Sequence, residues 1–375
     1  RQGMDGIIDL NPLLTEYKDL LPDLWALLGD YNIYYDQDPE TGSVWAIEAV
    51  LAESARIDTF IRKDWLDTVL LNVSKVPEDV SDETLYVYGY DDRHLLYPNY
   101  KEGIRVLNQW YNEGLIWKDF ALYTDASVED DMMKSGFVGA FIHNWDYPYR
   151  NGEDSIQANL TRANGADAGF IAVDCFQNDA GITRKYLADR IDRKVFFPAT
   201  NDEPLASLLY LNFISSEETI KFLQTGKEGV TYKMTDNGAY EMLNATGEWI
   251  MNSGMNIDHT ITVNGLYLGD ATAATKALSY PGVNPDFIIT ANTYGKLNGR
   301  IVKKFSCGAI SAEEDVGTSL NSKRDAMLTQ AVVAPVDQFD SVYDKGMADY
   351  LASGGQSIID ERREKLEAIY GVHVD

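Results

Sequence analysis

The sequence is poor in cysteine and histidine. Its two cysteines, Cys175 and Cys307, lie far apart and form neither a CxxC motif nor a Cys/His cluster. We interpret them as free or buried thiols, with a disulfide between them as the alternative. No two of the four histidines have the spacing of helical metal ligands, which argues against a zinc site. They are His94, His143, His259 and His373. We therefore predict no metal site from these side chains.

Basic side chains are also scarce. The 375 residues contain 32 lysines and arginines against 59 aspartates and glutamates, a formal net charge of −27. Such a chain repels phosphate backbones and anionic membranes, so we expect no nucleic-acid partner. No run of about 18 apolar residues occurs, so no segment is predicted to span a membrane. The sequence begins at Arg1 without a signal peptide, as a mature or shortened form would. We expect a monomer.

Length and patterning predict an α/β protein of two lobes. Helical signals run through most of the chain, and short β-prone runs are dispersed among them. The expected helices cover 7–27 (interrupted near Pro22), 99–116 (capped by Gly114), 126–136, 201–229 (two helices), 319–335 and 336–371. We expect a hairpin at 32–50, a strand leading into a helix at 58–71, a helix end followed by a strand at 72–94, and turns with short strands at 151–195.

The common catalytic motifs are missing. The sequence has no G-x-S-x-G, no GxxxxGK[ST] and no HExxH. Acidic runs at 129–131 and 313–315 fall at predicted helix starts, where the helix dipole accounts for them. A carboxylate pair formed by residues remote in sequence remains an alternative. The segment 36–42, DQDPETG, resembles a calcium loop, but Pro39 and a missing later glutamate favour a β-turn.

One segment stands out for its density of aromatic and polar side chains. Residues 138–150 read VGAFIHNWDYPYR. Val138, Ala140 and Ile142 are expected to fill the buried face of a strand. Three large aromatic residues, amide and carboxylate side chains and an arginine then follow within eight positions. Aromatic faces cover the apolar CH patch of a pyranose ring, and neighbouring polar groups pair with its hydroxyls. The strand end therefore favours a sugar-binding surface.

Several stretches, taken in order, resemble the family-1 extracellular solute-binding proteins, which deliver oligosaccharides to ABC importers. These stretches are VGAFIHNWDYPYR, FIRKDWLD, YKEGIRVLNQWYNEGLI, NDEPLASLLYLNFISSEETIKFLQTGKEGVTY and YDKGMADYLASGGQSIIDERREKLEAIY. The last is similar to the C-terminal helices of the large lipoprotein branch of Gram-positive bacteria. The resemblance extends from about residue 7 to residue 370.

The resemblance implies a fold and its division into lobes. The fold is the type II periplasmic-binding-protein-like α/β fold, with hinge strands, a C-terminal helical region and ligand in the cleft between two lobes. Residues 1–48 and 197–300 would form the N-terminal lobe, incomplete at its start. Residues 49–196 and 301–375 would form the C-terminal lobe. The chain would cross between lobes near residues 45–49, 197–199 and 300.

The family also implies a setting. It predicts an extracellular, cell-surface lipoprotein of a Gram-positive bacterium whose partners are oligosaccharide and the ABC-transporter permease. Membrane contact would be made only through an N-terminal lipid anchor that this sequence does not contain. The lipobox cysteine, some first-lobe strands and a longer insert near residues 72–86 are also lacking. We expect no cofactor, except that the resemblance places a possible structural calcium in such an absent segment.

We thus predict a sugar-binding, non-enzymatic component of an importer, with no catalytic residues. Trp145 is the expected stacking platform, extended by Tyr147 and Tyr149, with polar partners around it. The full set of predicted ligand contacts is Trp145, Tyr147, Tyr149, Asn144, Asp146, Arg150, Trp45, Arg62, Trp249 and Tyr232. Two alternatives remain open: a carbohydrate-active enzyme (glycoside hydrolase or lyase), and a binding protein for peptide or another small solute.

Overall fold

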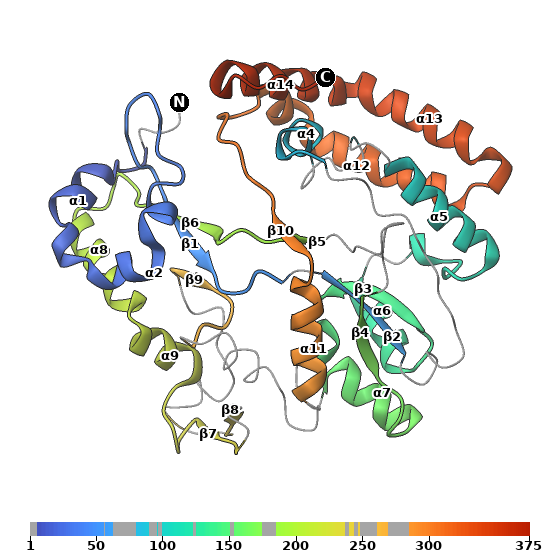
Figure 1. Cartoon of the computed structure of the whole chain (residues 1–375), viewed down its shortest axis with the longest axis horizontal. Coiled ribbons are helices and arrows are strands. Elements are labelled where there is room, and N and C mark those ends of the chain that lie inside the picture. The colour runs from blue at the N-terminus through green and yellow to red at the C-terminus, as the bar shows by residue number, and fades with distance from the viewer. Residues whose placement is uncertain are drawn as a thin grey trace. The chain divides into compact units, whose positions relative to one another are not determined.

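A computed structural model gives the arrangement of the chain (Figure 1). It describes residues 6–55, 57–62, 80–89, 96, 100–122, 125–150, 154–174, 185–236, 240–243, 247, 261–268 and 285–375. The chain divides into two compact units. Unit 1 comprises Arg1–Val76 and Asp130–Val302, and unit 2 comprises Pro77–Glu129 and Lys303–Asp375. The lobe boundaries implied by the resemblance stay a prediction.

The first core of unit 1 is built around strand β1 (Ile47–Leu51). β1 is almost entirely buried, and it pairs antiparallel with β6 (Ile191–Val195) and parallel with β9 (Val263–Asn264). Leucine and isoleucine side chains from the helices of this part of the chain pack on the strands. The helices are α1 (Asn11–Glu16), α2 (Pro22–Ile33), α8 (Pro204–Ser215) and α9 (Glu217–Thr225). Pro22 begins α2, as the interruption in the sequence pattern predicts.

The second core of unit 1 holds the aromatic segment. Strand β2 (Ile57–Arg62) lies between β3 (Ala140–Asn144) and β4 (Phe170–Val173), antiparallel to both. The helices of this part of the chain are α6 (Ala126–Lys134), α7 (Ile156–Asn164) and α11 (Pro285–Lys296). Figure 1 shows α7 and α11 close to this sheet.

The two faces of β3 are the reverse of the predicted ones. Ile142 is 56% exposed and Ala140 is also exposed. The inward side chain is Phe141, whose ring stacks on Phe60 with centroids 5.0 Å apart. The expectation that Ala140 and Ile142 fill the sheet is therefore wrong, because the strand register turns the odd-numbered residues toward the core. Val138, which precedes the strand, does pack against this core.

Short connections join the two cores. The Leu51 amide donates to the Arg190 carbonyl (2.7 Å) and the Ala188 amide to the Ser54 carbonyl (3.0 Å). The segment leaving β1 therefore runs beside the segment entering β6. β5 (Lys185–Leu187) also pairs parallel with β10 (Gly299–Ile301), and β7 (Tyr232–Met234) pairs with β8 (Tyr240–Met242).

Unit 2 is helical throughout its described residues outside loops and turns. Its helices are α4 (Asp82–Tyr88), α5 (Tyr100–Glu113), α12 (Ser311–Val333), α13 (Phe339–Tyr350) and α14 (Gln356–Tyr370). Asn108 on α5 is fully buried, and its Nδ2 donates to the carbonyls of Ala331, Val332 and Ala334 at the end of α12. This one side chain satisfies carbonyls that a helix end leaves without intrahelical partners.

Most expected helices are confirmed, and three local expectations are wrong. The stretch after Ser81 is helix α4 instead of a strand, because the Ser81 side chain caps it by accepting from the Thr84 amide. The segment 151–195 contains helix α7 as well as strands. The expected hairpin at 32–50 has its turn at Asp38–Ser43, but its first arm is no strand: it starts with the last two residues of α2 and continues as a turn. No helix in the described ranges is long and apolar enough to cross a membrane.

Candidate functional site

The aromatic segment turns sharply where β3 ends. Asn144 is the last strand residue, and a 3₁₀ turn covers Tyr147–Tyr149. Pro148 suits this turn because its fixed φ matches a helical start, and the Tyr149 amide donates to the Asp146 carbonyl (3.0 Å). The turn therefore sends the side chains after Asn144 in two directions, into the core and to the surface.

Tyr149 points into the core. It is fully buried, and its hydroxyl donates to the Phe170 carbonyl at 2.9 Å. Its ring lies edge-on to Phe60 (centroids 6.1 Å apart) and stacks with Phe287 (6.2 Å). Burial raises the pKa of Tyr149 well above its ordinary value. A ring enclosed in this way offers no face to a ligand in this structure.

Trp145 is also held in the core, with 6% of its surface exposed. Helix α11 approaches it closely at Gly295. A Cβ added there would lie 3.0 Å from the Cβ of Ala55 and 3.4 Å from the Cβ of Trp145. The absence of a side chain at Gly295 thus allows α11 to pack on the segment that carries Trp145.

The partly exposed side chains of this turn are His143, Asn144, Asp146, Tyr147 and Arg150. We call them the strand-end face. The rings of His143 and Tyr147 stack with centroids 3.4 Å apart and planes 18° apart. The backbone N–H of Asn144 donates to His143 Nδ1 (2.8 Å). The Tyr147 hydroxyl donates to Asp130 Oδ1 (2.6 Å).

The other half of the strand-end face is an ion pair. Arg150 Nε donates to Asp146 Oδ2 (2.9 Å) and Arg150 Nη2 to Asp146 Oδ1 (2.6 Å), a two-pronged geometry. The guanidinium carbon lies 5.7 Å from the centre of the Tyr147 ring. The face therefore combines stacked flat rings, an amide and a fixed charge pair. Such a set can cover an apolar ring face and exchange hydrogen bonds with hydroxyl groups.

The remaining predicted contacts lie elsewhere. Arg62 is 3% exposed, and its Nη1 donates to the Gly136 carbonyl (3.1 Å). Trp45 is half-buried just before β1 in the first core. Tyr232 is 5% exposed and packs on Tyr240, with ring centroids 4.8 Å apart. Trp249 lies outside the described residues. The structure brings together the six residues from Asn144 to Arg150 that the sequence selects, and the ligand contacts of all ten stay predictions.

A buried carboxylate lies on β1 in the first core. Glu48 faces Lys194 across the β1–β6 pair, with 3.4 Å between Glu48 Oε1 and Lys194 Nζ. Lys194 Nζ also contacts Asp36 Oδ2. Burial, followed by the neighbouring Asp36, raises the pKa of Glu48 to about 7. Glu48 is 3% exposed, and its environment accounts for it as a structural cross-strand partner of Lys194.

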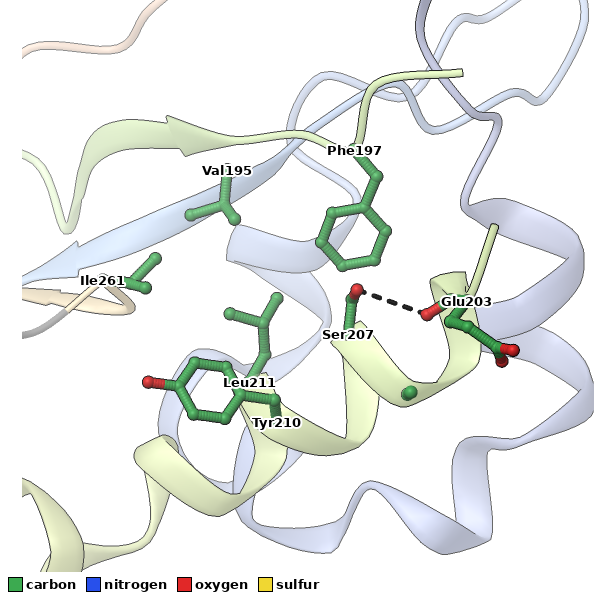
Figure 2. Close-up of a pocket in the computed structure, with 8 residues that line it drawn as sticks. Val195, Phe197, Glu203, Ser207, Tyr210, Leu211 and Ile261 are labelled. Atoms are coloured by element: carbon green, nitrogen blue, oxygen red, sulfur yellow. Dashed lines mark hydrogen bonds between the residues drawn. The ribbon is translucent and has the colours of Figure 1, made fainter. Parts of the chain in front are cut away.

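Sequence reasoning missed a pocket beside α8. Its volume is about 430 Å³, and its lining is mostly apolar. Figure 2 shows the rings of Phe197 and Tyr210 with Leu211 between them, and the Glu203 carboxylate turned away from them. The full lining is Val195, Phe197, Glu203, Ala206, Ser207, Tyr210, Leu211 and Ile261. The signal was available: α8 reads PLASLLYLNFIS and is apolar on all sides, so some apolar side chains must be exposed.

Metal and thiol chemistry find little support in the described part of the chain. No cluster of three or more histidine, cysteine or acidic side chains there has a geometry for a metal ion. The 36–42 segment forms the predicted turn, in which Asp38 Oδ1 accepts from the amides of Glu40 (2.9 Å) and Thr41 (3.1 Å). Cys307 is a buried free thiol, and burial raises its pKa. Cys175 lies outside the described residues.

Comparison with known proteins identifies the fold. No protein-family model matches the chain, and no curated protein matches it. Solved structures do. The alginate-binding protein AlgQ2, solved without calcium ion, is 14% identical, with a TM-score of 0.61 over 96% of this chain and 82% of that one. An HMO-binding, ABC-transporter associated solute-binding protein from Bifidobacterium longum infantis is 13% identical, with a TM-score of 0.59 over 96% of this chain and 84% of that one.

A third match is the S. pneumoniae ABC-transporter substrate-binding protein FusA, an EF-hand mutant in complex with fructo-nystose. It is 11% identical, with a TM-score of 0.58 over 98% of this chain and 84% of that one. At these identities the similarity concerns the fold. The α/β, two-lobed solute-binding fold predicted from the sequence is confirmed, and this chain has the fold of ABC-transporter solute-binding proteins.

Proposed function

We propose that this protein is the extracellular substrate-binding component of an ABC importer and that it binds oligosaccharide at the strand-end face. The match of nearly the whole chain to sugar-binding ABC-transporter proteins is the observation that carries the proposal. The strand-end face adds a local reason. Its stacked His143 and Tyr147 rings, exposed Asn144 amide and Asp146–Arg150 pair are the groups that recognise ring faces and hydroxyls.

We propose the setting from the sequence resemblance together with these neighbours. The protein would act outside the cytoplasmic membrane, deliver intact sugar to the permease subunits and belong to the family-1 lipoproteins of Gram-positive bacteria. An N-terminal lipid anchor would hold it at the cell surface. Its strongly acidic surface, with a net charge of −27, suits a protein that stays soluble near an anionic envelope.

An enzyme is the rival from another class. A glycoside hydrolase needs two carboxyl groups about 5–10 Å apart across the scissile bond, one of them with a raised pKa. Glu48 has a raised pKa, but it is 3% exposed between the paired strands of the first core. Asp130 and Asp146 at the strand-end face are held by Tyr147 and Arg150 respectively. These contacts favour binding over catalysis.

The deciding experiment is a titration of the purified protein with neutral oligosaccharides, acidic oligosaccharides and peptides, with binding measured by tryptophan fluorescence and calorimetry. The glycans are then recovered and analysed by chromatography. We expect saturable binding with every glycan recovered intact. Shortened glycan would establish the enzyme instead, and binding of peptides but of no glycan would establish the peptide-binding alternative.

Two alanine variants place the site. Tyr147→Ala removes the stacked ring of the strand-end face, and we expect it to weaken sugar binding at least about tenfold, the typical cost of losing one well-packed aromatic contact. Tyr210→Ala is the matched control, because Tyr210 is a 55% exposed tyrosine in the α8 pocket of the same unit. Loss of binding in Tyr210→Ala alone would move the sugar site to the α8 pocket.

Treatment with EDTA should leave the affinity unchanged, since the proposal involves no metal.

A further inference from the structure

Charge at the strand-end face bears on the class of sugar. Arg150 is 39% exposed, and by type it is the side chain suited to a uronate carboxylate. However, two of its N–H groups already bond both oxygens of Asp146, at 2.9 and 2.6 Å. Asp146 is fixed by its place just before the 3₁₀ turn and is 16% exposed. The pair presents no net charge, so an incoming carboxylate must compete with an internal one.

Arg62, the other arginine among the predicted ligand contacts, cannot take the place of Arg150 as a cation at the strand-end face. Ile57 faces Asn144 in the β2–β3 register, whereas Arg62 lies five residues further along β2. At about 3.3 Å per residue, its Cα is on the order of 16 Å from the strand end. Arg62 is also 3% exposed and bonded to the Gly136 carbonyl. It therefore acts within the core and contributes no cation to the strand-end face.

The segment that carries the strand-end face contains more acidic than basic residues. The segment 125–150, which forms α6, β3 and the turn, carries five carboxylates and two cations. One of the carboxylates, Asp130, accepts from the Tyr147 hydroxyl directly at the face. On α11 of the same core, Lys296 Nζ is neutralised by Glu53 Oε1 at 2.8 Å. Carboxylates accept hydrogen bonds from sugar hydroxyls, but they repel a uronate.

We propose that the bound oligosaccharide is neutral and that the Asp146–Arg150 pair excludes its uronate counterpart. This inference rests on the proposed function, because it specifies the ligand of that same site. The pair gives hydroxyl groups both donors and acceptors, whereas a carboxylate meets one occupied guanidinium and two nearby carboxylates. The exclusion is electrostatic, so it weakens as salt is added.

The test compares matched ligands by calorimetry at low ionic strength. Neutral gluco-, manno- and galacto-oligosaccharides are each paired with the uronate of equal length and linkage. We expect the best neutral sugar to bind at least about tenfold more tightly than its uronate. Equal or tighter uronate binding would overturn this inference and leave the proposed function standing. Binding of neither class would refute the proposed function, and this inference with it.

Charge variants show whether the pair is responsible. Asp146→Asn removes the internal competitor, so the preference for neutral sugar should fall about tenfold or reverse. Asp131→Asn is the matched control: it makes the same charge change on α6 at an exposed residue, and the preference should persist. An equal effect of both variants would overturn the assignment to the pair. If Asp146→Asn fails to fold, as judged by circular dichroism, Arg150→Gln gives the answer, because it should widen the preference for neutral sugar.

Discussion

Tyr147 and Tyr149 lie two residues apart. Removing the hydroxyl of Tyr149 should mainly lower stability, whereas removing the hydroxyl of Tyr147 should mainly lower sugar affinity. Tyr149→Phe keeps the enclosed ring but deletes the hydroxyl that donates to the Phe170 carbonyl at 2.9 Å. Tyr147→Phe deletes the hydroxyl that donates to Asp130 at the partly exposed strand-end face. The two changes are chemically identical, so any difference between them reports where each ring lies.

The magnitude for Tyr149 follows from its burial. A buried hydrogen bond contributes about 1 kcal/mol, and an acceptor left without its partner in the core adds a desolvation cost. We expect Tyr149→Phe to lower the free energy of unfolding by about 1–3 kcal/mol. In a unit of this size each kcal/mol corresponds to about 2–4 °C in Tm. The sugar affinity should stay within about twofold, because the ring contributes no surface to the proposed site.

For Tyr147→Phe we expect a small loss of stability and a larger loss of sugar affinity. Its hydrogen bond is partly solvated, so its loss should cost less than about 1 kcal/mol of stability. The ring, however, loses the contact that fixes it against His143, and the sugar affinity should fall about three- to tenfold. Thermal unfolding followed by circular dichroism and calorimetric titration of the best glycan measure the two effects. Our placement is refuted if Tyr149→Phe abolishes sugar binding without loss of stability.

Three further predictions concern stability. Gly136→Ala should lower Tm by several degrees more than Gly165→Ala: both glycines have positive φ, but a Cβ at Gly136 would lie 2.7 Å from Asn164 Nδ2 and 2.9 Å from Arg62 Nη1, whereas Gly165 has open space. Asn108→Ala should cost about 2–3 kcal/mol in denaturant unfolding, because it removes the side-chain donor to the Ala331 and Val332 carbonyls at the end of α12; the exposed neighbour Gln109→Ala should cost under about 0.5 kcal/mol. The pKa of Glu48 is raised from 4.5 to about 7 on folding, so native Glu48 holds its proton where the unfolded side chain has lost it, and the wild type should lose stability relative to Glu48→Gln as pH rises from about 4.5 to 7. A Tm difference that stays constant over that pH range would contradict the assignment.

Local sequence signals predicted the helices well where the backbone itself enforces them. Pro22 begins α2 because it lacks an amide proton and has the φ of a helical start. Gly114 follows α5 with φ of +81°, a conformation that other residues rarely adopt. The helix at 82–88 was not predicted because Tyr86, Val87 and Tyr88 favour strands, whereas the Ser81 cap and the buried Leu85 and Val87 stabilise a helix.

The candidate site was predictable in location but not in its division between core and surface. Residues 144–150 are contiguous, so any fold that ends a strand there keeps them together. Three pairs spaced four residues apart then act together across the turn: the stacked His143 and Tyr147, the buried Trp145 and Tyr149, and the ion-paired Asp146 and Arg150. The spacing was visible in the sequence. His143 and Trp145 have the same parity along the chain, so the turn that begins after Asn144, and not strand alternation, decides which pair faces the core.

The two arginines show most clearly why pairing decides function. Arg62 and Arg150 are both among the ligand contacts predicted from the sequence. If both faced the ligand, their two positive charges would favour an acidic glycan. Antiparallel pairing of β2 with β3 instead places Arg62 at the end of the sheet away from Asn144, where it bonds to the Gly136 carbonyl. Of the two, only Arg150 lies at the strand end, and its guanidinium is hydrogen-bonded to the Asp146 carboxylate. Under our proposal the charge class of the ligand therefore depends on strand register and one neighbouring carboxylate, and the comparison of Asp146→Asn with Asp131→Asn measures that dependence directly.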